Sequence, residues 1–334
     1  MNKINISLLD IQKAQKKILP FVKKTTLKKS PFLSQQLGMP LFLKWETEQK
    51  IKSFKLRGAL NKILSLSDQE KKRGLIASSA GNHAQGVSLA AHYAQTKARV
   101  VMMETASKVK VEAAKKLGAE VILKGRTYDE CYEHALSIQG DSVFIHPFFD
   151  SLIVAGQATV GLEILEQNPS ISSCVFAIGG GGLISGSAFA IKQIKPSCKV
   201  YGVVWQGTPS FCKDYHQKKD ACLCGVSNNT DQNFKIGLTD GIAVKKQEPK
   251  MLEFSRDYID DVGCVTDEDI EQTMVNLWKH EKQKVEGSGA AALAGIFKYK
   301  KKWDLGNQAC VIISGGNVDD LILSDLMKKY GKDH

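Results

Sequence analysis

The sequence predicts an α/β protein with two three-layer α/β/α domains and largely parallel sheets. From about residue 41, short apolar runs rich in β-branched residues alternate with longer stretches of helical spacing. This alternation is typical of parallel sheets covered by helices on both faces. The run Cys174–Ile178 is apolar at every position, as a central parallel strand must be. The strand–helix units are too many for one compact sheet, so two domains are expected.

The predicted elements follow one another in regular order. The expected strands are Leu41–Trp45, Leu75–Ser78, Arg99–Met103, Glu120–Leu123, Val143–Ile145, Cys174–Ile178, Lys199–Val204 and Cys310–Ile313. The expected helices are Ala84–Ala94, Lys108–Leu117, Tyr128–Ile138, Leu152–Glu166, Ile184–Ile194, Asp267–His280 and Ala290–Lys300. The polar, glycine-containing stretch Asn228–Asp240 is expected to be a long loop or linker.

Two polar stretches, Glu46–Lys52 and Phe149–Ser151, mark the expected domain boundaries. Residues 51–150 would form a small domain inserted into a large one, which consists of residues 1–50 plus 151–334. Ligands of open α/β folds bind outside the carboxyl ends of the strands. The site is therefore expected in the cleft between the two sheets.

The net charge of +11 does not by itself indicate a nucleic-acid partner. The lysines are spread along helical faces, and no helix-turn-helix, zinc-finger or RNA-binding motif is present. We interpret them as a solvated surface. No apolar run approaches the roughly 20 residues that span a bilayer, and the N-terminal stretch has no h-region with a small-residue cleavage site, so export is not expected. The eight scattered cysteines contain no CxxC motif and are expected to be reduced thiols of a cytoplasmic protein.

Lys55 is the candidate catalytic residue. It stands in Ser53-Phe54-Lys55, at the start of a helical pattern, and Ser53 is expected to cap that helix. In the first turn, the positive end of the helix dipole disfavours an ammonium and lowers the lysine pKa. A lysine that is less stable as a cation can form an imine with an aldehyde or ketone. The alternative for this residue taken alone is an ordinary solvated lysine.

Four consecutive glycines, Gly179, Gly180, Gly181 and Gly182, follow a predicted strand and begin a helix. Their backbone can point several N–H groups at one anion, so the stretch predicts a phosphate site. The alternative is a tight turn with no ligand. The dinucleotide motif G-x-G-x-x-G does not fit, because Ile184 or Ser185 occupies its last glycine position. A Walker A motif is excluded because Ser187, not lysine, follows Gly186.

Two further strand-to-helix turns carry polar groups. The turn Ser79-Ala80-Gly81-Asn82-His83 suits a small anion such as a carboxylate. Asn82 could donate to a ring oxygen. His83 is a candidate general base, although a histidine at a helix start is more often structural. In Ser314-Gly315-Gly316-Asn317, the Ser314 hydroxyl could bond a ring nitrogen, with a cap or turn residue as the alternative.

A reactive lysine, a phosphate site, a carboxylate site and a hydroxyl for a pyridine nitrogen together describe a pyridoxal-phosphate site. The sequence resembles the fold-type II pyridoxal-phosphate enzymes, which have the tryptophan synthase β-like fold. It is most similar to their threonine/serine ammonia-lyase (dehydratase) branch. The resemblance spans nearly the whole chain in six segments: SFKLRGA at 53–59, SAGNHAQG at 79–86, GGGGLISG at 179–186, TDGIAV at 239–244, VEGSGA at 285–290 and SGGN at 314–317.

The resemblance implies a role for each of these positions. Lys55 would hold pyridoxal 5'-phosphate covalently and act as the base at the substrate Cα. Phe54 would pack near the cofactor ring, Asn82 would bond its phenolic oxygen, and Ser314 would meet its pyridine nitrogen. The remaining cofactor-binding positions would be Gly179, Gly180, Gly181, Gly182, Leu183 and Gly241. The substrate-binding positions would be Ser79, Ala80, Gly81, Asn82 and His83.

The implied reaction removes the β-hydroxyl of L-threonine or L-serine and yields 2-oxobutanoate or pyruvate plus ammonia. The alternatives are a serine racemase, a 3-hydroxyaspartate ammonia-lyase, and a catalytically silent ligand-binding protein. The family loop reads T-G-S-F-K, whereas Ile51 and Lys52 precede Ser53 here, which leaves the substrate open. Ala80 replaces the serine that the racemases use as an acid/base, which argues against racemisation.

The resemblance also gives expectations about partners. The stretch Val204–Pro209 lacks the acidic residues of the racemases' metal segment, so no metal site is expected there. The sequence ends at His334, which leaves no room for the regulatory domain of the biosynthetic threonine enzymes. A homodimer or homotetramer is expected, with an amino-acid substrate and with no nucleic-acid or membrane partner.

Overall fold

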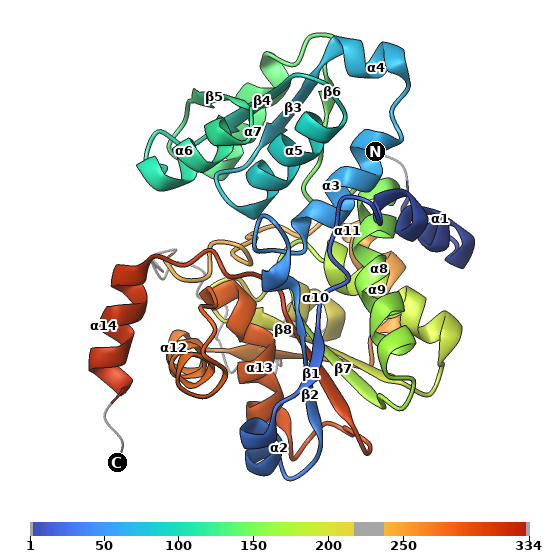
Figure 1. Ribbon diagram of the computed structural model, residues 1–334, viewed down its shortest axis with the longest axis vertical. Helices are drawn as coiled ribbons and strands as arrows, with labels where there is room; N and C mark the ends of the chain where they lie inside the picture. Colours follow the sequence, from blue (N-terminus) through green and yellow to red (C-terminus); the bar gives the residue numbers. More distant parts are fainter. Residues whose placement is uncertain (1–2, 217–236, 332–334) are drawn as a thin grey trace.

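The computed structural model describes residues 3–216 and 237–331 of the 334-residue chain. Its strands form two sheets, one of six strands in the order β1-β2-β10-β7-β8-β9 and one of four in the order β5-β4-β3-β6. In Figure 1 the four-stranded sheet lies above the six-stranded one, and helices pack around both. The predicted α/β class with two largely parallel sheets is confirmed.

The six-stranded sheet comprises β1 (Leu27–Lys29), β2 (Leu41–Trp45), β7 (Ser173–Ala177), β8 (Lys199–Trp205), β9 (Asp261–Val265) and β10 (Ala309–Ile313). Its strands pair in parallel except β1, which pairs antiparallel with β2. Every residue of β7 and β10 is buried, as expected for central strands covered on both faces.

The sequence analysis missed two strands of this sheet. The edge strand β1 has only three residues, and its two lysines are exposed, so it has no apolar pattern. Strand β9 contains Gly263, a residue type depleted in strands. The structure needs glycine there, because a Cβ would lie 2.3 Å from the Tyr299 ring.

The four-stranded sheet comprises β3 (Leu75–Ser78), β4 (Ala98–Met102), β5 (Glu120–Leu123) and β6 (Val143–Phe144). All of its strands pair in parallel. The eight predicted strands of the chain are confirmed with ends that differ by at most one residue.

The helices agree with most of the predicted ranges. They are α1 (Leu8–Ile18), α2 (Pro31–Leu37), α3 (Lys55–Leu64), α4 (Asp68–Arg73), α5 (Asn82–Tyr93), α6 (Lys108–Lys116), α7 (Tyr128–Ser137), α8 (Ser151–Gln167), α9 (Gly182–Ile194), α10 (Ser210–His216), α11 (Pro249–Ser255), α12 (Asp267–Asn276), α13 (Gly287–Tyr299) and α14 (Asp320–Tyr330). The helix predicted over Asp267–His280 is interrupted, because α12 ends at Asn276 and a π-helical turn covers Leu277–Glu281.

Helix α3 lies between the two sheets (Figure 1) and packs through glycines on both sides. A Cβ on Gly156 of α8 would lie 2.6 Å from the Arg57 carbonyl oxygen. A Cβ on Gly58 would lie 2.5 Å from Gln157 Nε2, and one on Gly86 of α5 would lie 3.2 Å from the Lys55 carbonyl oxygen. These close contacts fix the first turn of α3 against α8 and α5.

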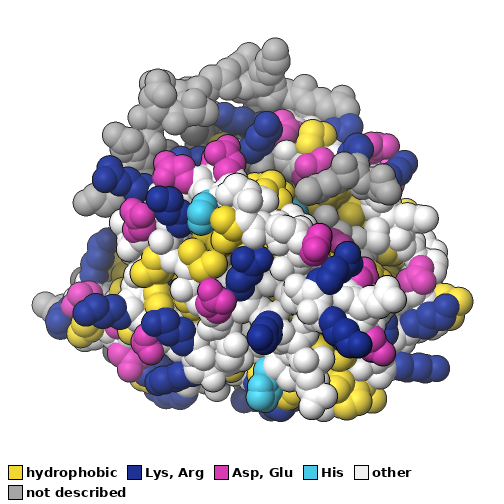
Figure 2. All heavy atoms as spheres, turned by 90° about the horizontal axis from the view of Figure 1, so that it is seen from above, with side chains coloured by type: hydrophobic (Ala, Val, Ile, Leu, Met, Phe, Trp, Pro, Cys, Tyr) yellow, Lys and Arg dark blue, Asp and Glu magenta, His cyan; other side chains and the backbone are white. Residues whose placement is uncertain are grey.

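Further predictions concern the charged surface, the cysteines, membrane-spanning helices and one long loop. Figure 2 shows Lys and Arg mixed with Asp and Glu on the face seen from above. The six cysteines in the described part of the chain are buried free thiols. No helix among residues 3–216 and 237–331 is long and apolar enough to cross a bilayer. Most of the predicted loop Asn228–Asp240 lies outside the described residues.

The loop before α3 contains a strained residue. Lys52 has a φ of 54°, a left-handed conformation that costs a non-glycine residue roughly 1–2 kcal/mol. Its backbone is held from both sides, since its N–H donates to Gln49 O (2.7 Å) and its carbonyl accepts from Gly316 N–H (2.9 Å). Lys52 stands where the family that the sequence resembles has glycine. Its positive φ is a backbone conformation that glycine adopts without strain.

Replacing Lys52 by glycine should relieve this strain. The gain is partly offset by the greater freedom of glycine in the unfolded chain, so we expect the free energy of unfolding to rise by about 0.5 kcal/mol. Thermal and urea unfolding would measure it. Lys97 is the matched control, because it is an exposed loop lysine with negative φ, and Lys97→Gly should lower stability. A Lys52→Gly protein as destabilised as Lys97→Gly would contradict the strained conformation.

Candidate active site

Lys55 is the first residue of α3, as predicted for the first helical turn. Its Nζ donates to the Pro147 carbonyl at 3.0 Å and lies 5.3 Å from the centroid of the Phe54 ring. Burial lowers the pKa of Lys55 to about 8. Roughly one Lys55 amine in ten is therefore neutral at pH 7, against a few in ten thousand for an ordinary lysine.

The prediction that Ser53 caps α3 is wrong. The N-cap residue is Phe54, and no side chain caps the helix. Ser53 instead forms an isolated antiparallel bridge with Gly315, and the Phe54 N–H donates to Ser314 O at 3.2 Å. This pairing holds Ser53 away from the capping position. Its hydroxyl is buried and has no hydrogen-bond partner among the described residues.

The four glycines form an open helix N-terminus. Helix α9 begins at Gly182, and its N-cap Gly181 has a φ of 86°, which favours glycine. No side chain caps α9, although ten of its residues are buried. The Ser185 hydroxyl in its first turn is buried and lacks a partner within the described chain. Free amide groups and an unsatisfied hydroxyl at a helix N-terminus are suited to a phosphate.

The loop after β6 connects this helix N-terminus to Lys55. Pro147 supplies the carbonyl that Lys55 contacts, and the next residue, Phe148, packs on the glycines. A Cβ on Gly180 would lie 2.2 Å from the Phe148 ring. His146 Nδ1 accepts the Phe148 and Phe149 N–H groups at 3.2 and 2.8 Å. Burial, followed by the charge of Lys55, lowers the pKa of His146 to about 4, so the ring is neutral and can accept.

Sequence reasoning missed this loop. The sequence did contain a signal for it. His146 and Pro147 follow the predicted strand Val143–Ile145, and ligands of α/β folds bind at the carboxyl ends of parallel strands. The polar pattern at Phe149–Ser151 predicts only a domain boundary.

Gly241, Ser288 and Ser314 lie beside the glycine loop. A Cβ on Gly179 would lie 3.0 Å from Gly241 O, and one on Gly241 would lie 2.8 Å from Ser288 Oγ. The Ser314 hydroxyl donates to Ser288 O at 3.3 Å. This long bond is weak enough for the hydroxyl to turn to another acceptor. The chain thus brings Ser314 and the four glycines to the same region through Gly241 and Ser288.

The turn Ser79–His83 leads into α5, which begins within it at Asn82. Its first four residues are partly exposed, and no side chain caps α5. The Ser79 hydroxyl accepts the Gly81 N–H at 3.2 Å. His83 is buried, with Nε2 2.9 Å from Ile145 O, and burial followed by the charge of Lys55 lowers its pKa to about 3. A neutral histidine tied to a backbone carbonyl does not suit the general-base role considered for it.

Glu286 is a site residue that sequence reasoning passed over. In the sequence it stands only within the motif VEGSGA at 285–290, but in the structure its buried carboxyl group accepts from Asn82 Nδ2 at 2.6 Å. Burial, followed by the charge of Asp240, raises the pKa of Glu286 to about 8. Asn317 Nδ2 donates to Asn82 Oδ1 at 2.7 Å, so Glu286 and Asn317 together orient the Asn82 amide. One Nδ2 hydrogen of Asn82 remains for a ligand.

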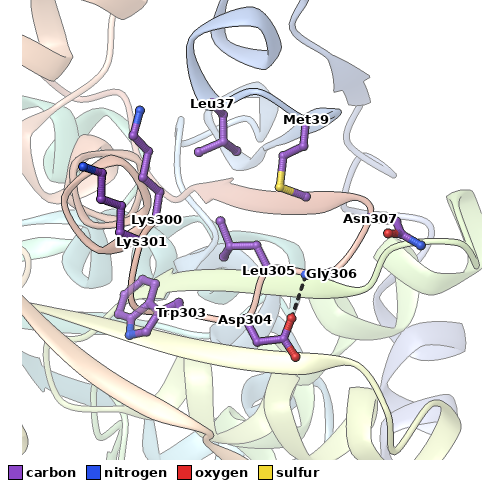
Figure 3. A pocket seen from close by; sticks show the side chains of 9 residues that line it. All are labelled: Leu37, Met39, Lys300, Lys301, Trp303, Asp304, Leu305, Gly306 and Asn307. Carbon is purple, nitrogen blue, oxygen red and sulfur yellow. Dashed lines mark hydrogen bonds between the residues drawn. The ribbon is translucent and has the colours of Figure 1, made fainter.

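A surface hollow lies away from these residues. A surface hollow of about 620 Å³ includes Leu37, Met39, Trp303 and Asn307 (Figure 3). These residues precede β2 and β10 or follow α13, so the hollow is at the amino ends of the strands, away from Lys55. No group of three or more His, Cys, Asp or Glu that could hold a metal occurs among residues 3–216 and 237–331.

Comparison with known proteins places the chain in a family. The family model described as "Pyridoxal-phosphate dependent enzyme" matches residues 18–315. The chain belongs to this family of pyridoxal-phosphate dependent enzymes. This family assignment confirms the resemblance found in the sequence.

Relatives of this pyridoxal-phosphate dependent enzyme extend over nearly its whole length. The L-threonine ammonia-lyase of Thermotoga maritima is 41% identical over 327 residues, which cover 97% of this chain and 79% of that protein. The catabolic L-threonine dehydratase TdcB of Staphylococcus aureus is 39% identical over 319 residues, 94% of this chain and 90% of that protein. The structure of maize serine racemase superposes with a TM-score of 0.87 at 32% identity and covers 97% of each chain.

The residues present fit pyridoxal phosphate. An amine of lowered pKa suits its aldehyde, the open N-terminus of α9 suits its phosphate, and Asn82 and Ser314 can bond its ring oxygen and nitrogen. The hydroxyls of Ser53, Ser185 and Ser288 are buried and unpaired among the described residues. Buried polar groups are normally satisfied, so this grouping indicates a place for a polar ligand.

Labelling should detect the lowered pKa of Lys55. Because burial disfavours the ammonium, the neutral amine becomes the main form above about pH 8 rather than above the ordinary value of 10.5. In protein freed of cofactor, the rate of acetylation of Lys55 by trace acetic anhydride should therefore be half-maximal near pH 8 and level off at higher pH. Mass spectrometry of the digest would give the rate at each pH, with exposed lysines as internal controls. A midpoint above pH 10 would show that the amine is solvated.

Gly180→Ala should disturb the phosphate site. Its Cβ would meet the Phe148 ring at 2.2 Å, and overpacking of this kind costs about 1–3 kcal/mol. We expect lower stability and at least about tenfold weaker binding of pyridoxal phosphate, measured by thermal unfolding and by absorbance titration. Gly81→Ala is the stability control, because φ is negative there and a Cβ meets nothing within 4 Å. Unchanged binding in Gly180→Ala would rule out the contact with Phe148.

Proposed function

We propose that this enzyme eliminates the β-hydroxyl of L-threonine or L-serine and releases ammonia with 2-oxobutanoate or pyruvate. The observation that carries the proposal is the connection of Lys55 to the glycine loop. The amine contacts Pro147 O at 3.0 Å, and the adjacent Phe148 packs on Gly180. An amine and an anion site joined by one dipeptide match the aldehyde and phosphate of one small cofactor. The relatives named L-threonine ammonia-lyase and L-threonine dehydratase support the substrate class.

Lys55 is the proposed base. Pyridoxal phosphate, when bound, withdraws electrons from the substrate Cα and makes its proton more acidic. Lys55 then removes that proton, and its lowered pKa keeps it close to the pH at which general bases work best. The Cα–H bond and the Cβ–O bond both break, and the hydroxyl leaves as water after it is protonated. The resulting enamine takes up water and releases ammonia and the keto acid.

We consider two groups as the source of the proton for the leaving hydroxyl. One is Lys55 itself, once it has taken up the Cα proton. The other is Glu286, which is mostly protonated at pH 7 because its pKa is raised to about 8, first by burial. We assign the transfer to Lys55, because it acts at the neighbouring carbon. Glu286 instead holds the Asn82 amide at 2.6 Å.

The substrate carboxylate is proposed to bind at the turn Ser79–His83. The first four residues of this turn are partly exposed, and α5 begins within the turn. The first amides of α5 have no side-chain cap. Amides at a helix N-terminus favour an anion. The neutral state of His83 adds no charge to the turn, so the backbone supplies the binding.

The remaining expectations stay predictions. Residues 51–150 would be the small domain and residues 1–50 plus 151–334 the large one, with the proposed site between them. The strands of the four-stranded sheet all fall within residues 75–144, which supports this division. A homodimer or homotetramer in the cytoplasm is also proposed from the family resemblance.

Lys55→Ala tests the proposed base. We expect the visible absorbance of the bound cofactor to change and kcat for keto-acid formation to fall by about 10²–10⁴-fold or more, while far-UV circular dichroism is retained. Lys62→Ala is the control, since Lys62 lies near the other end of α3 and should leave kcat nearly unchanged. Retained turnover in Lys55→Ala would refute the role given to Lys55.

The same assay separates the alternatives. Each preparation would be given L-threonine, L-serine and 3-hydroxyaspartate, and the keto acid and D-serine would both be measured. Ala80 offers no hydroxyl for a second acid/base, so we expect keto acid from L-threonine or L-serine. Steady formation of D-serine without keto acid would overturn the elimination in favour of racemisation.

A further inference from the structure

Arg57 lies two residues after Lys55 on α3 and is completely buried. Each residue turns an α-helix by about 100°, so two residues turn it by roughly 200°. The side chains of Lys55 and Arg57 therefore leave α3 on nearly opposite sides. Lys55 contacts the loop after β6, whereas Arg57 contacts Glu46, which follows a strand of the six-stranded sheet, and Glu163 of α8.

Arg57 binds two buried glutamates in bidentate fashion. Its Nε and Nη2 donate to Glu46 at 2.8 Å each. Its Nη1 and Nη2 donate to Glu163 at 2.7 and 2.9 Å. Nη1 also donates to Thr159 Oγ1 at 3.1 Å. Glu46 follows β2, and Thr159 and Glu163 stand on α8, so one side chain fixes α3 to two elements at once.

Lys44 completes a buried charge cluster of Lys44, Glu46, Arg57 and Glu163. Its Nζ donates to Glu163 at 2.7 Å, to Thr25 O at 2.8 Å and to Gln167 at 2.8 Å. The cluster holds two positive and two negative side chains, so its charges balance. Burial alone would raise the pKa of Glu46, but the charge and hydrogen bonds of Arg57, the charge of Lys44 and the Thr25 hydrogen bond together outweigh burial and hold that pKa below its usual value.

Lys44 and Arg57 differ in one respect. Both are buried cations of the same cluster and both bind Glu163, but Lys44 lies on β2 and only Arg57 lies on α3. Removing either cation leaves a buried carboxylate short of a partner, which is costly. Only the loss of Arg57 also removes a side-chain attachment of the first turn of α3.

We propose that Arg57 is a positioning residue for Lys55, holding the first turn of α3 against β2 and α8 so that the Lys55 amine meets its ligand. The inference rests on the proposed function, because it takes Lys55 as the reacting amine. A planar guanidinium suits this task, since its fork binds two carboxylates in fixed directions, which an ammonium cannot do. Gly58 and Gly156 bring α3 close enough to α8 for the fork to reach Glu163.

The test compares Arg57→Met with Lys44→Met. Protein freed of cofactor is mixed with pyridoxal 5'-phosphate, the bond formed with lysines is fixed by borohydride, and the rate of labelling at Lys55 is read by mass spectrometry. Both variants should lose thermal stability. In Arg57→Met the labelling rate at Lys55 should fall by about 10- to 100-fold, because small misplacement of a reacting group has effects of this size. In Lys44→Met the rate should stay within about twofold of the wild type.

Conservative variants keep the test decisive if a methionine variant fails to fold. Arg57→Lys retains the charge but loses the fork, and Lys44→Arg retains the charge on β2. We expect slower labelling of Lys55 only in Arg57→Lys. Equal labelling in Arg57→Lys and the wild type, or an equal loss in the Lys44 variants, would overturn the inference. Wild-type protein with no label at Lys55 would instead overturn the proposed function, and the inference with it.

Discussion

The site depends on the partial desolvation of one lysine amine. An amine in water is a cation at neutral pH and does not attack a carbonyl, whereas an amine sealed in the core would meet no ligand. Lys55 lies between these limits, since it is partly accessible and burial lowers its pKa to about 8. Helices α5 and α8 pack on α3 through glycines, and the loop after β6 supplies a carbonyl, that of Pro147, which accepts from the amine.

Close approach of backbones explains the many glycines around this amine. A side chain on Gly180 would strike Phe148, one on Gly289 would lie 2.2 Å from Gly315 O, and one on Gly315 would lie 1.9 Å from Glu286. Each contact joins segments far apart in the sequence. Several of the six motifs therefore meet in space through their glycines, since Gly86 approaches Lys55 O, Gly241 approaches Ser288 Oγ and Gly315 approaches Glu286.

The sequence predicted the strands well and the site in part. Buried strands such as β7 and β10 have clear apolar patterns, whereas β1 is too short and β9 contains a glycine that only tertiary contact requires. Lys55 and the glycine loop could be found from local patterns. The capping role of Ser53 was wrong because pairing with Gly315 overrides local preference. Glu286 contacts Asn82, which is distant in the chain, so no local signal assigns it a role. Pro147 follows a predicted strand, which marks the edge of the sheet where a site is expected but does not show its contact with Lys55.

The dipeptide Pro147-Phe148 has a consequence for ligand choice. Its first residue touches the amine and its second touches the anion loop, so two adjacent residues link the positions of both, and the proline ring restricts one backbone torsion between them. Such a spacing favours ligands of one length. Aldehydes that are much shorter or longer than this span can contact the Lys55 amine or the glycine loop but not both. Other reactive carbonyl compounds would therefore bind Lys55 only weakly.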